Sequence, residues 1–234
     1  MAKAKKPSRK ELLKEPDEFL TLSRRMIQFS VAHKKTILFG IAAFFGILVA
    51  AAGVQYYTVR AENRAFSLLH EATAAYEQAA SAGNPRHARD SSAQAFEALL
   101  DRHSGRTAAK IGRVIYADIC YRGGDPATAA VLYQEALSDF RGDPALHSLI
   151  TTGLAYAWEA RGDLEKAAAF FRQILDGPSS LMKEDAQFQL AGLSIRMGRL
   201  QEGAALYQKI AEEHPDSLYG QIAKEKAARL DASG

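Results

Sequence analysis

The stretch 154-LAYAWEARGDLEKAAAFFRQI-174 decides the fold of this chain. Its apolar residues recur every three or four positions on both sides of a Gly-Asp pair, which is typical of two short helices joined by a tight turn. Gly162 is suited to end the first helix, and Asp163 is suited to cap the start of the second. The stretch therefore predicts a helical hairpin.

The same pattern occurs three times. Its turn glycines, Gly124, Gly162 and Gly198, are 38 and 36 residues apart. In each unit a large residue and Ala stand eight and seven positions before the glycine. A small residue stands five positions after it, an aromatic residue nine after, and Ala or Ile twelve after. Strand patterns of useful length are lacking after residue 58, so the sequence predicts a stack of helical hairpins.

These constant positions have a packing reason. A large residue followed by Ala on the first helix lets the second helix approach closely. The small residue on the second helix, which is Ala129, Ala167 or Gly203, is expected where the two helices cross. The aromatic residue is expected to fill the space toward the next hairpin.

This pattern resembles the tetratricopeptide repeat. The best unit matches the positions of that repeat with Leu154, Ala155, Trp158, Ala167 and Phe171. The units depart from the family in several respects. Ala stands in all three where the family prefers Gly, Cys120 and Ser194 stand where an aromatic residue is usual, the period is two to four residues longer, and only the last unit has the expected proline, Pro215. The resemblance implies a solenoid that acts by presenting a surface to a protein partner.

We therefore predict an all-α fold, with a single N-terminal transmembrane helix followed by a tetratricopeptide-like helical-hairpin solenoid and a C-terminal capping helix. The predicted parts are a basic arm at 1–35, a transmembrane helix at 36–57 and a repeat domain at 58–234. Within the repeat domain we expect hairpins at about 60–103, 106–140, 146–176 and 182–213, and a capping helix at 217–230. The heptad-like spacing from Ala65 to Ala79 leaves a short coiled-coil stalk as the alternative to the first hairpin.

The transmembrane prediction rests on an unbroken apolar run from Ile37 to Val54. Eighteen residues at about 1.5 Å each cover about 27 Å, close to the ~30 Å hydrocarbon core of a bilayer. A cleavable signal peptide ending near Ala52 is the alternative, but the 35-residue arm and the apolar run are both longer than such a peptide has. We expect an uncleaved anchor.

Charge sets the expected orientation. Residues 1–35 hold ten basic and four acidic residues, a net charge of +6, whereas the remaining chain holds 20 basic and 23 acidic residues. The positive-inside rule therefore predicts a cytoplasmic N-terminus. Within the arm, residues 16–29 suggest an amphipathic helix lying on anionic lipid, although its basic residues could equally serve orientation alone.

Composition and motifs exclude several classes. The mildly acidic repeat domain is a poor nucleic-acid binder, and one cysteine, Cys120, rules out a disulfide framework. No two of the six His stand three or four positions apart with a carboxylate partner, as a metal site would require, and glycine-rich phosphate loops and catalytic triad patterns are absent. We expect no catalytic residues, cofactor or metal, and thus no enzyme.

A binding groove is expected on the first helix of each hairpin. Its predicted lining is Ile111, Val114, Tyr121, Leu149, Tyr156, Phe188 and Ile195. Aromatic side chains there can bind apolar segments of many sequences, since they bury large areas with few rotors. The alternative, that the aromatic residues pack against neighbouring repeats, carries equal weight.

A second contact face is expected within the bilayer. Ala42, Gly46 and Ala50 recur every four residues, the small-xxx-small spacing that lets transmembrane helices approach closely. Such spacing also arises by chance in Ala- and Gly-rich spans. Contact between two copies of the chain through this face would give a homo-oligomer.

The whole layout is similar to the YfgM-like ancillary subunits of the bacterial Sec translocon. The resemblance implies a single-pass protein of the bacterial inner membrane, with its repeat domain in the periplasm. It also implies Sec translocon subunits, periplasmic chaperones and newly exported polypeptides as partners. The alternative function is a structural scaffold for a cell-envelope assembly complex.

The orientation can be tested with a reporter that is active only outside the cytoplasm. Fused after Gly234, the reporter should be active, and neutral residues in place of Arg24, Arg25, Lys34 and Lys35 should mix the orientation. A soluble, shortened form released after Ala52 would contradict the anchor.

Overall fold

The protein is all-helical. A computed structural model describes residues 18–232, and it contains ten helices and no strand within that range. The first half of the predicted basic arm, residues 1–17, lies outside the described residues. The helices are α2 (Glu18–Ala32), α3 (Lys34–Ala80), α4 (Pro85–His103), α5 (Thr107–Arg122), α6 (Pro126–Asp139), α7 (Pro144–Ala160), α8 (Leu164–Asp176), α9 (Lys183–Arg196), α10 (Leu200–Glu213) and α11 (Leu218–Asp231).

The chain divides into two compact units, Met1–Val59 and Arg60–Gly234. The first unit contains α2 and the N-terminal part of α3. Within α3 lies an apolar stretch long enough to cross a membrane, and none of it is buried by protein. This is the long apolar N-terminal helix that the sequence predicts, and it is compatible with a single-pass anchor.

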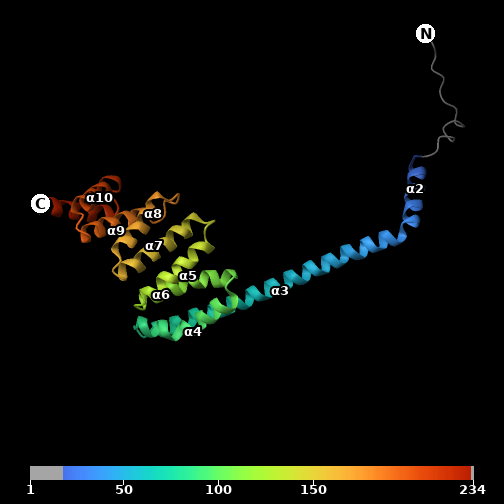
Figure 1. The fold of residues 1–234 in the computed structure, drawn as a ribbon, viewed down its shortest axis with the longest axis horizontal. Coiled ribbons are helices and arrows are strands. Elements are labelled where there is room, and N and C mark those ends of the chain that lie inside the picture. The colour runs from blue at the N-terminus through green and yellow to red at the C-terminus, as the bar shows by residue number, and fades with distance from the viewer. Residues whose placement is uncertain (1–17, 233–234) are drawn as a thin grey trace, which may run out of the picture. The chain divides into compact units, whose positions relative to one another are not determined.

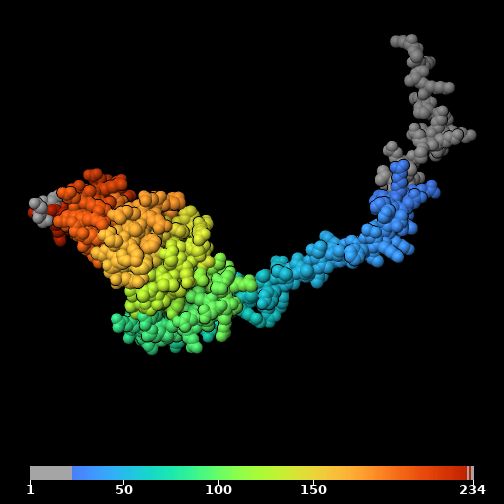
Figure 2. All heavy atoms as spheres, in the orientation of Figure 1, coloured from blue at the N-terminus to red at the C-terminus, as the bar shows by residue number. Residues whose placement is uncertain are grey.

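The second unit is a stack of helical hairpins. The end of α3 is followed by α4, and the pairs α5–α6, α7–α8 and α9–α10 follow in chain order before α11 (Figure 1). Side chains fill the space between successive pairs, which form consecutive bands of colour from green to red (Figure 2). The predicted all-helical repeat fold is confirmed.

The first hairpin is part of the packed domain. Ala65, Leu69 and Ala72 of α3 are buried in the same core cluster as Phe96 and Leu99 of α4. In a coiled-coil stalk, these residues of α3 would instead pack against a helix of another chain.

Glycine ends the first helix of each repeat. Gly124, Gly162 and Gly198 have φ of 78°, 84° and 80°, in the left-handed region that other residues rarely adopt. The residue after each glycine donates its amide to the carbonyl five positions earlier, as Asp163 does to Trp158 at 3.1 Å. This is the hydrogen-bond pattern of a Schellman C-cap, and it explains the constant position of the turn glycines.

Aspartate starts the following helix in two of these repeats. Asp125 accepts from the amide of Thr128 at 3.1 Å, and Asp163 accepts from that of Lys166 at 3.2 Å. The Thr128 amide lowers the pKa of the Asp125 carboxyl, because it stabilises the charged form. Arg199, at the matching position of the third repeat, makes no such cap.

Small residues lie where the paired helices approach most closely. Ala129 and Ala167 are fully buried. A Cβ added to Gly203 would lie 2.9 Å from the carbonyl oxygen of Ala191 on the preceding helix. Successive hairpins are equally tight, since a Cβ on Gly153 of α7 would lie 2.5 Å from the Cζ of Tyr133 on α6. The aromatic residue at this position therefore packs toward the next hairpin, as the sequence predicts.

Helix α11 covers the end of the stack. Its Ala223 and Ala227 pack against Ala191, Tyr207 and Ile210. The Ser217 hydroxyl accepts from the amide of Gly220 at 2.9 Å and donates to the carboxylate of Glu184 on α9. The last apolar face of the repeats is thereby closed.

The crossing of α7 and α8 predicts that replacement by Leu lowers stability by different amounts at Ala167 of α8 and at Ala160 of α7. Ala167→Leu should lower the free energy of unfolding by about 1–3 kcal/mol, because the added atoms overpack a fully buried site. Ala160→Leu, at the exposed end of α7, should change it much less. Chemical denaturation of both variants measures the difference, and equal losses would contradict the assigned crossing.

Candidate protein-binding surface

The predicted groove residues lie on the first helices of three successive hairpins. Ile111, Val114 and Tyr121 belong to α5, Leu149 and Tyr156 to α7, and Phe188 and Ile195 to α9. We call these seven residues the first-helix surface. Counted from the turn glycine of its hairpin, each residue stands 13, 10, 6 or 3 positions before it. This spacing of three or four residues places them on the same side of each first helix.

The first-helix surface is half-buried. Leu149 is 45% exposed, whereas the other six residues are partly buried and pack against the hydrophobic cores. These six thus contribute to stability and also present part of their area to solvent. A partner would reach Leu149 and the open sides of its neighbours.

Aromatic rings connect the hairpins along this surface. The Tyr121 and Tyr156 rings are 6.5 Å apart between centroids, and Tyr156 makes an edge contact at 5.5 Å with Phe171 of α8. Phe188 lies 5.4 Å from Tyr207 and 5.0 Å from Tyr219 of α11. The structure therefore brings Tyr121 and Tyr156 together, and it places Phe188 in a separate group of rings.

A buried carboxylate joins the two groups. Asp185 of α9 is 8% exposed, and the hydroxyls of Tyr156 and Tyr219 donate to it at 3.0 and 2.8 Å. Gln189 adds a longer contact at 3.4 Å. The charge also lies in the first turn of α9, where the helix dipole favours an anion.

The network keeps both tyrosines protonated. Burial, followed by the nearby charge of Asp185, raises the pKa of Tyr156. Burial and the hydrogen bond to Asp185 raise the pKa of Tyr219 to about 12. The hydroxyls therefore remain donors at physiological pH, and Asp185 links α7, α9 and α11.

Sequence analysis predicted the capping helix but not its link to α7 and α9 through Tyr219. The partners of Asp185 are 29 and 34 residues away in the chain. One signal was present, since Asp185 stands three residues before Phe188 and therefore on the side of α9 that the sequence assigned to the groove.

Ion pairs border the surface. Asp118 pairs with Arg122 at 2.8 Å on α5, and Glu159 of α7 pairs with Arg196 of α9. Arg122, Asp118 and Arg196 are 65%, 44% and 52% exposed and Glu159 is 22% exposed, so each pair contributes little to stability. The Glu159–Arg196 pair connects neighbouring first helices.

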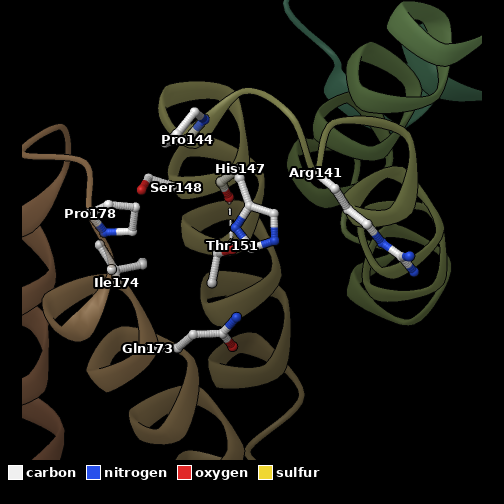
Figure 3. Close-up of a pocket in the computed structure, with 9 residues that line it drawn as sticks. Arg141, Pro144, His147, Ser148, Thr151, Gln173, Ile174 and Pro178 are labelled. Atoms are coloured by element: carbon white, nitrogen blue, oxygen red, sulfur yellow. Dashed lines mark hydrogen bonds between the residues drawn. The ribbon is translucent and has the colours of Figure 1, made fainter.

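Two hollows lie away from the first-helix surface. One, of about 240 Å³, includes Arg141, His147 and Gln173 among its lining residues. Figure 3 shows these side chains around it, with Thr151 donating to the His147 carbonyl at 2.7 Å. The other, of about 480 Å³, lies between α10 and α11. No predicted groove residue lines either hollow.

Reactive and metal-binding groups offer little alternative chemistry. Cys120 is buried, and burial raises the pKa of its thiol to about 11, so the thiol is protonated at neutral pH. In the part of the chain that the structure describes, no three His, Cys, Asp or Glu side chains are placed to hold a metal ion.

The predicted contact face of the span is open. A Cβ added to Gly46 would meet nothing within 4 Å, and Ala42 and Ala50 are exposed. Contact of a second helix with this face stays a prediction.

Comparisons with known proteins identify the fold. A family profile described as a tetratricopeptide repeat-like domain matches residues 28–178, and a tetratricopeptide repeat profile matches residues 185–217. No curated protein matches the sequence.

Several solved structures have a similar fold. A tetratricopeptide repeat protein from Parabacteroides merdae is 17% identical with a TM-score of 0.54, and the match covers 71% of this chain but only 61% of that one. The tetratricopeptide-like repeats assigned to a kinesin light chain of Podosopora anserina are 15% identical with a TM-score of 0.56, over 72% of this chain and 86% of that one. Identities this low support the fold and say nothing about partners.

The Asp185 network predicts a stabilising role for a tyrosine hydroxyl. Tyr219→Phe removes a hydrogen bond to a buried carboxylate and should cost about 1.5–3 kcal/mol of unfolding free energy. Tyr76→Phe is the matched control on α3, and it should change stability little. Denaturation of the full chain in detergent measures both; similar values would mean that the network contributes nothing.

Proposed function

This chain belongs to the tetratricopeptide repeat-like domain family, and from that membership we propose that it is a membrane-anchored protein-binding protein. Such repeats generally mediate contacts with protein partners. We propose further that it acts beside the Sec translocon of a bacterial inner membrane, as an adaptor or holdase for newly exported polypeptides. Its partners would then be translocon subunits, periplasmic chaperones or the exported chains themselves, and it would have no catalytic activity of its own.

The protein-binding proposal rests on one observation. The residues of the first-helix surface are partly buried in the hydrophobic cores and partly exposed to solvent. Tyr121, Tyr156 and Phe188 are held by ring contacts, so they lose little freedom when a partner covers them. Leu149 stands among them with nearly half of its surface exposed. A prearranged apolar and aromatic surface suits segments of many sequences, because it relies on buried area instead of specific hydrogen bonds.

The apolar stretch of α3 supports the location. It is wholly uncovered in the protein, and a bilayer would remove these side chains from water. The basic residues before it favour a cytoplasmic N-terminus and a periplasmic repeat domain. A binding surface held beside the membrane would meet polypeptides as they emerge.

A photo-crosslinking amino acid tests both parts of the proposal. At position 149, on the first-helix surface, it should capture partners in intact cells. At position 131 the exposed residue is Val131, which lies on the second helix α6 and provides the matched control. Both side chains are exposed, so neither replacement should disturb the core.

The identity of the products decides between the functions. Translocon subunits together with many secreted chains, captured at 149 and not at 131, would support the adaptor. One stoichiometric envelope protein would favour the scaffold instead. Equal products at both positions would contradict a specific first-helix surface.

A further inference from the structure

Helix α2 carries apolar side chains that no other part of the described chain covers. Met26, Ile27, Phe29 and Val31 are each between 61% and 65% exposed. They fall within six residues and precede the span, so they are not part of it. An exposed apolar patch of this kind marks an interaction surface.

Polar and apolar side chains divide the circumference of α2. At about 100° per residue, Arg24, Gln28 and Arg25 share one sector of α2. The four apolar residues and two serines share the rest of the circumference, with Met26 nearly opposite Gln28 and Val31 at the edge beside Arg24. This division is typical of a helix that lies in the plane of a membrane surface.

Four cations flank the patch in the sequence. Arg24, Arg25, Lys34 and Lys35 are exposed, and the ion pairs among the described side chains involve none of them. Lys34 and Lys35 stand in the first turn of α3, where the helix dipole favours anions and no acidic residue is present. These exposed cations can contact an anion.

Helix α2 directly precedes the apolar run of α3. A single residue, His33, separates α2 from α3, and the apolar run begins at Ile37. The His33 ring stacks on Phe29 at 4.5 Å, and its Nδ1–H donates to the Phe29 carbonyl at 3.2 Å. The chain changes direction at this junction (Figure 1). If α3 crosses a bilayer, the C-terminal end of α2 must therefore lie at its surface.

We propose that α2 is an interfacial helix that binds anionic phospholipid. Met26, Ile27, Phe29 and Val31 enter the boundary between headgroups and acyl chains, and Arg24, Arg25, Lys34 and Lys35 contact the lipid phosphates. The proposal rests on membrane anchoring by α3 and does not depend on the first-helix surface.

Spin labels on the full chain test the depth of each side of α2. In a Cys120→Ser background, single cysteines replace Met26, Ile27, Gln28 or Phe45, and each labelled protein is reconstituted into vesicles. Collision rates with oxygen, which concentrates in lipid, and with a nickel chelate, which stays in water, are then compared. Vesicles of phosphatidylcholine alone and vesicles with added phosphatidylglycerol form the two arms.

The expected pattern follows the helix faces. With phosphatidylglycerol present, labels at 26 and 27 should be accessible to oxygen and the label at 28 to the chelate. The label at 45 reports insertion of the span independently. A lipid signal at 45 with no difference between 27 and 28 would overturn the proposal and leave the anchor intact, whereas loss of the signal at 45 would overturn the anchor and with it this proposal.

Charge neutralisation tests the lipid class. Replacing Arg24, Arg25, Lys34 and Lys35 with Gln should reduce the contrast between 27 and 28 to its value in phosphatidylcholine. The matched control replaces four exposed basic residues of the repeat domain, Arg102, Arg141, Lys224 and Arg229, and should retain the contrast. An equal contrast in both lipids and in both variants would overturn the role of anionic lipid.

Discussion

The close approach of the two helices within each hairpin is the constraint on which the repeat domain depends. Ala129 and Ala167 are fully buried, and at Gly203 an added Cβ would lie 2.9 Å from a backbone carbonyl. A larger residue at these positions would separate the helices and forfeit the contacts around them. The left-handed glycine turns serve the same geometry, because they return the chain at once onto the preceding helix.

Stacking of these hairpins gives the first-helix surface a double role. Its aromatic rings support neighbouring repeats, and their uncovered sides remain open to a partner. Asp185 connects α7, α9 and the capping helix α11 through tyrosine hydroxyls, so the binding surface and the closure of the stack share one network. In a solenoid, where each unit contacts mainly its neighbours, such a link between three helices stiffens the end of the array.

The N-terminal unit follows a different physical rule. The repeat domain buries its apolar side chains within the protein, whereas the large apolar side chains described in α2 and at the start of α3 are 36–77% exposed. A bilayer is the solvent that makes such a helix favourable, and exposed cations beside it match the charge of anionic lipid. One chain thereby combines an apolar helix compatible with a membrane anchor with a tetratricopeptide-like repeat domain, which is the combination that the proposed function requires.

The sequence alone determined the features that depend on short-range patterns. Helical periodicity, the glycine turns at Gly124, Gly162 and Gly198, and the apolar run from Ile37 predicted the all-helical repeats and the long apolar helix, because these signals are local. It also predicted which side of each first helix to examine, but not how far Tyr156 and Phe188 are buried. The Asp185 network, and Met182 with its φ of 67° before α9, were decided by the tertiary structure. Both depend on the angle and distance at which helices from different repeats meet, and residue periodicity carries no information about those quantities.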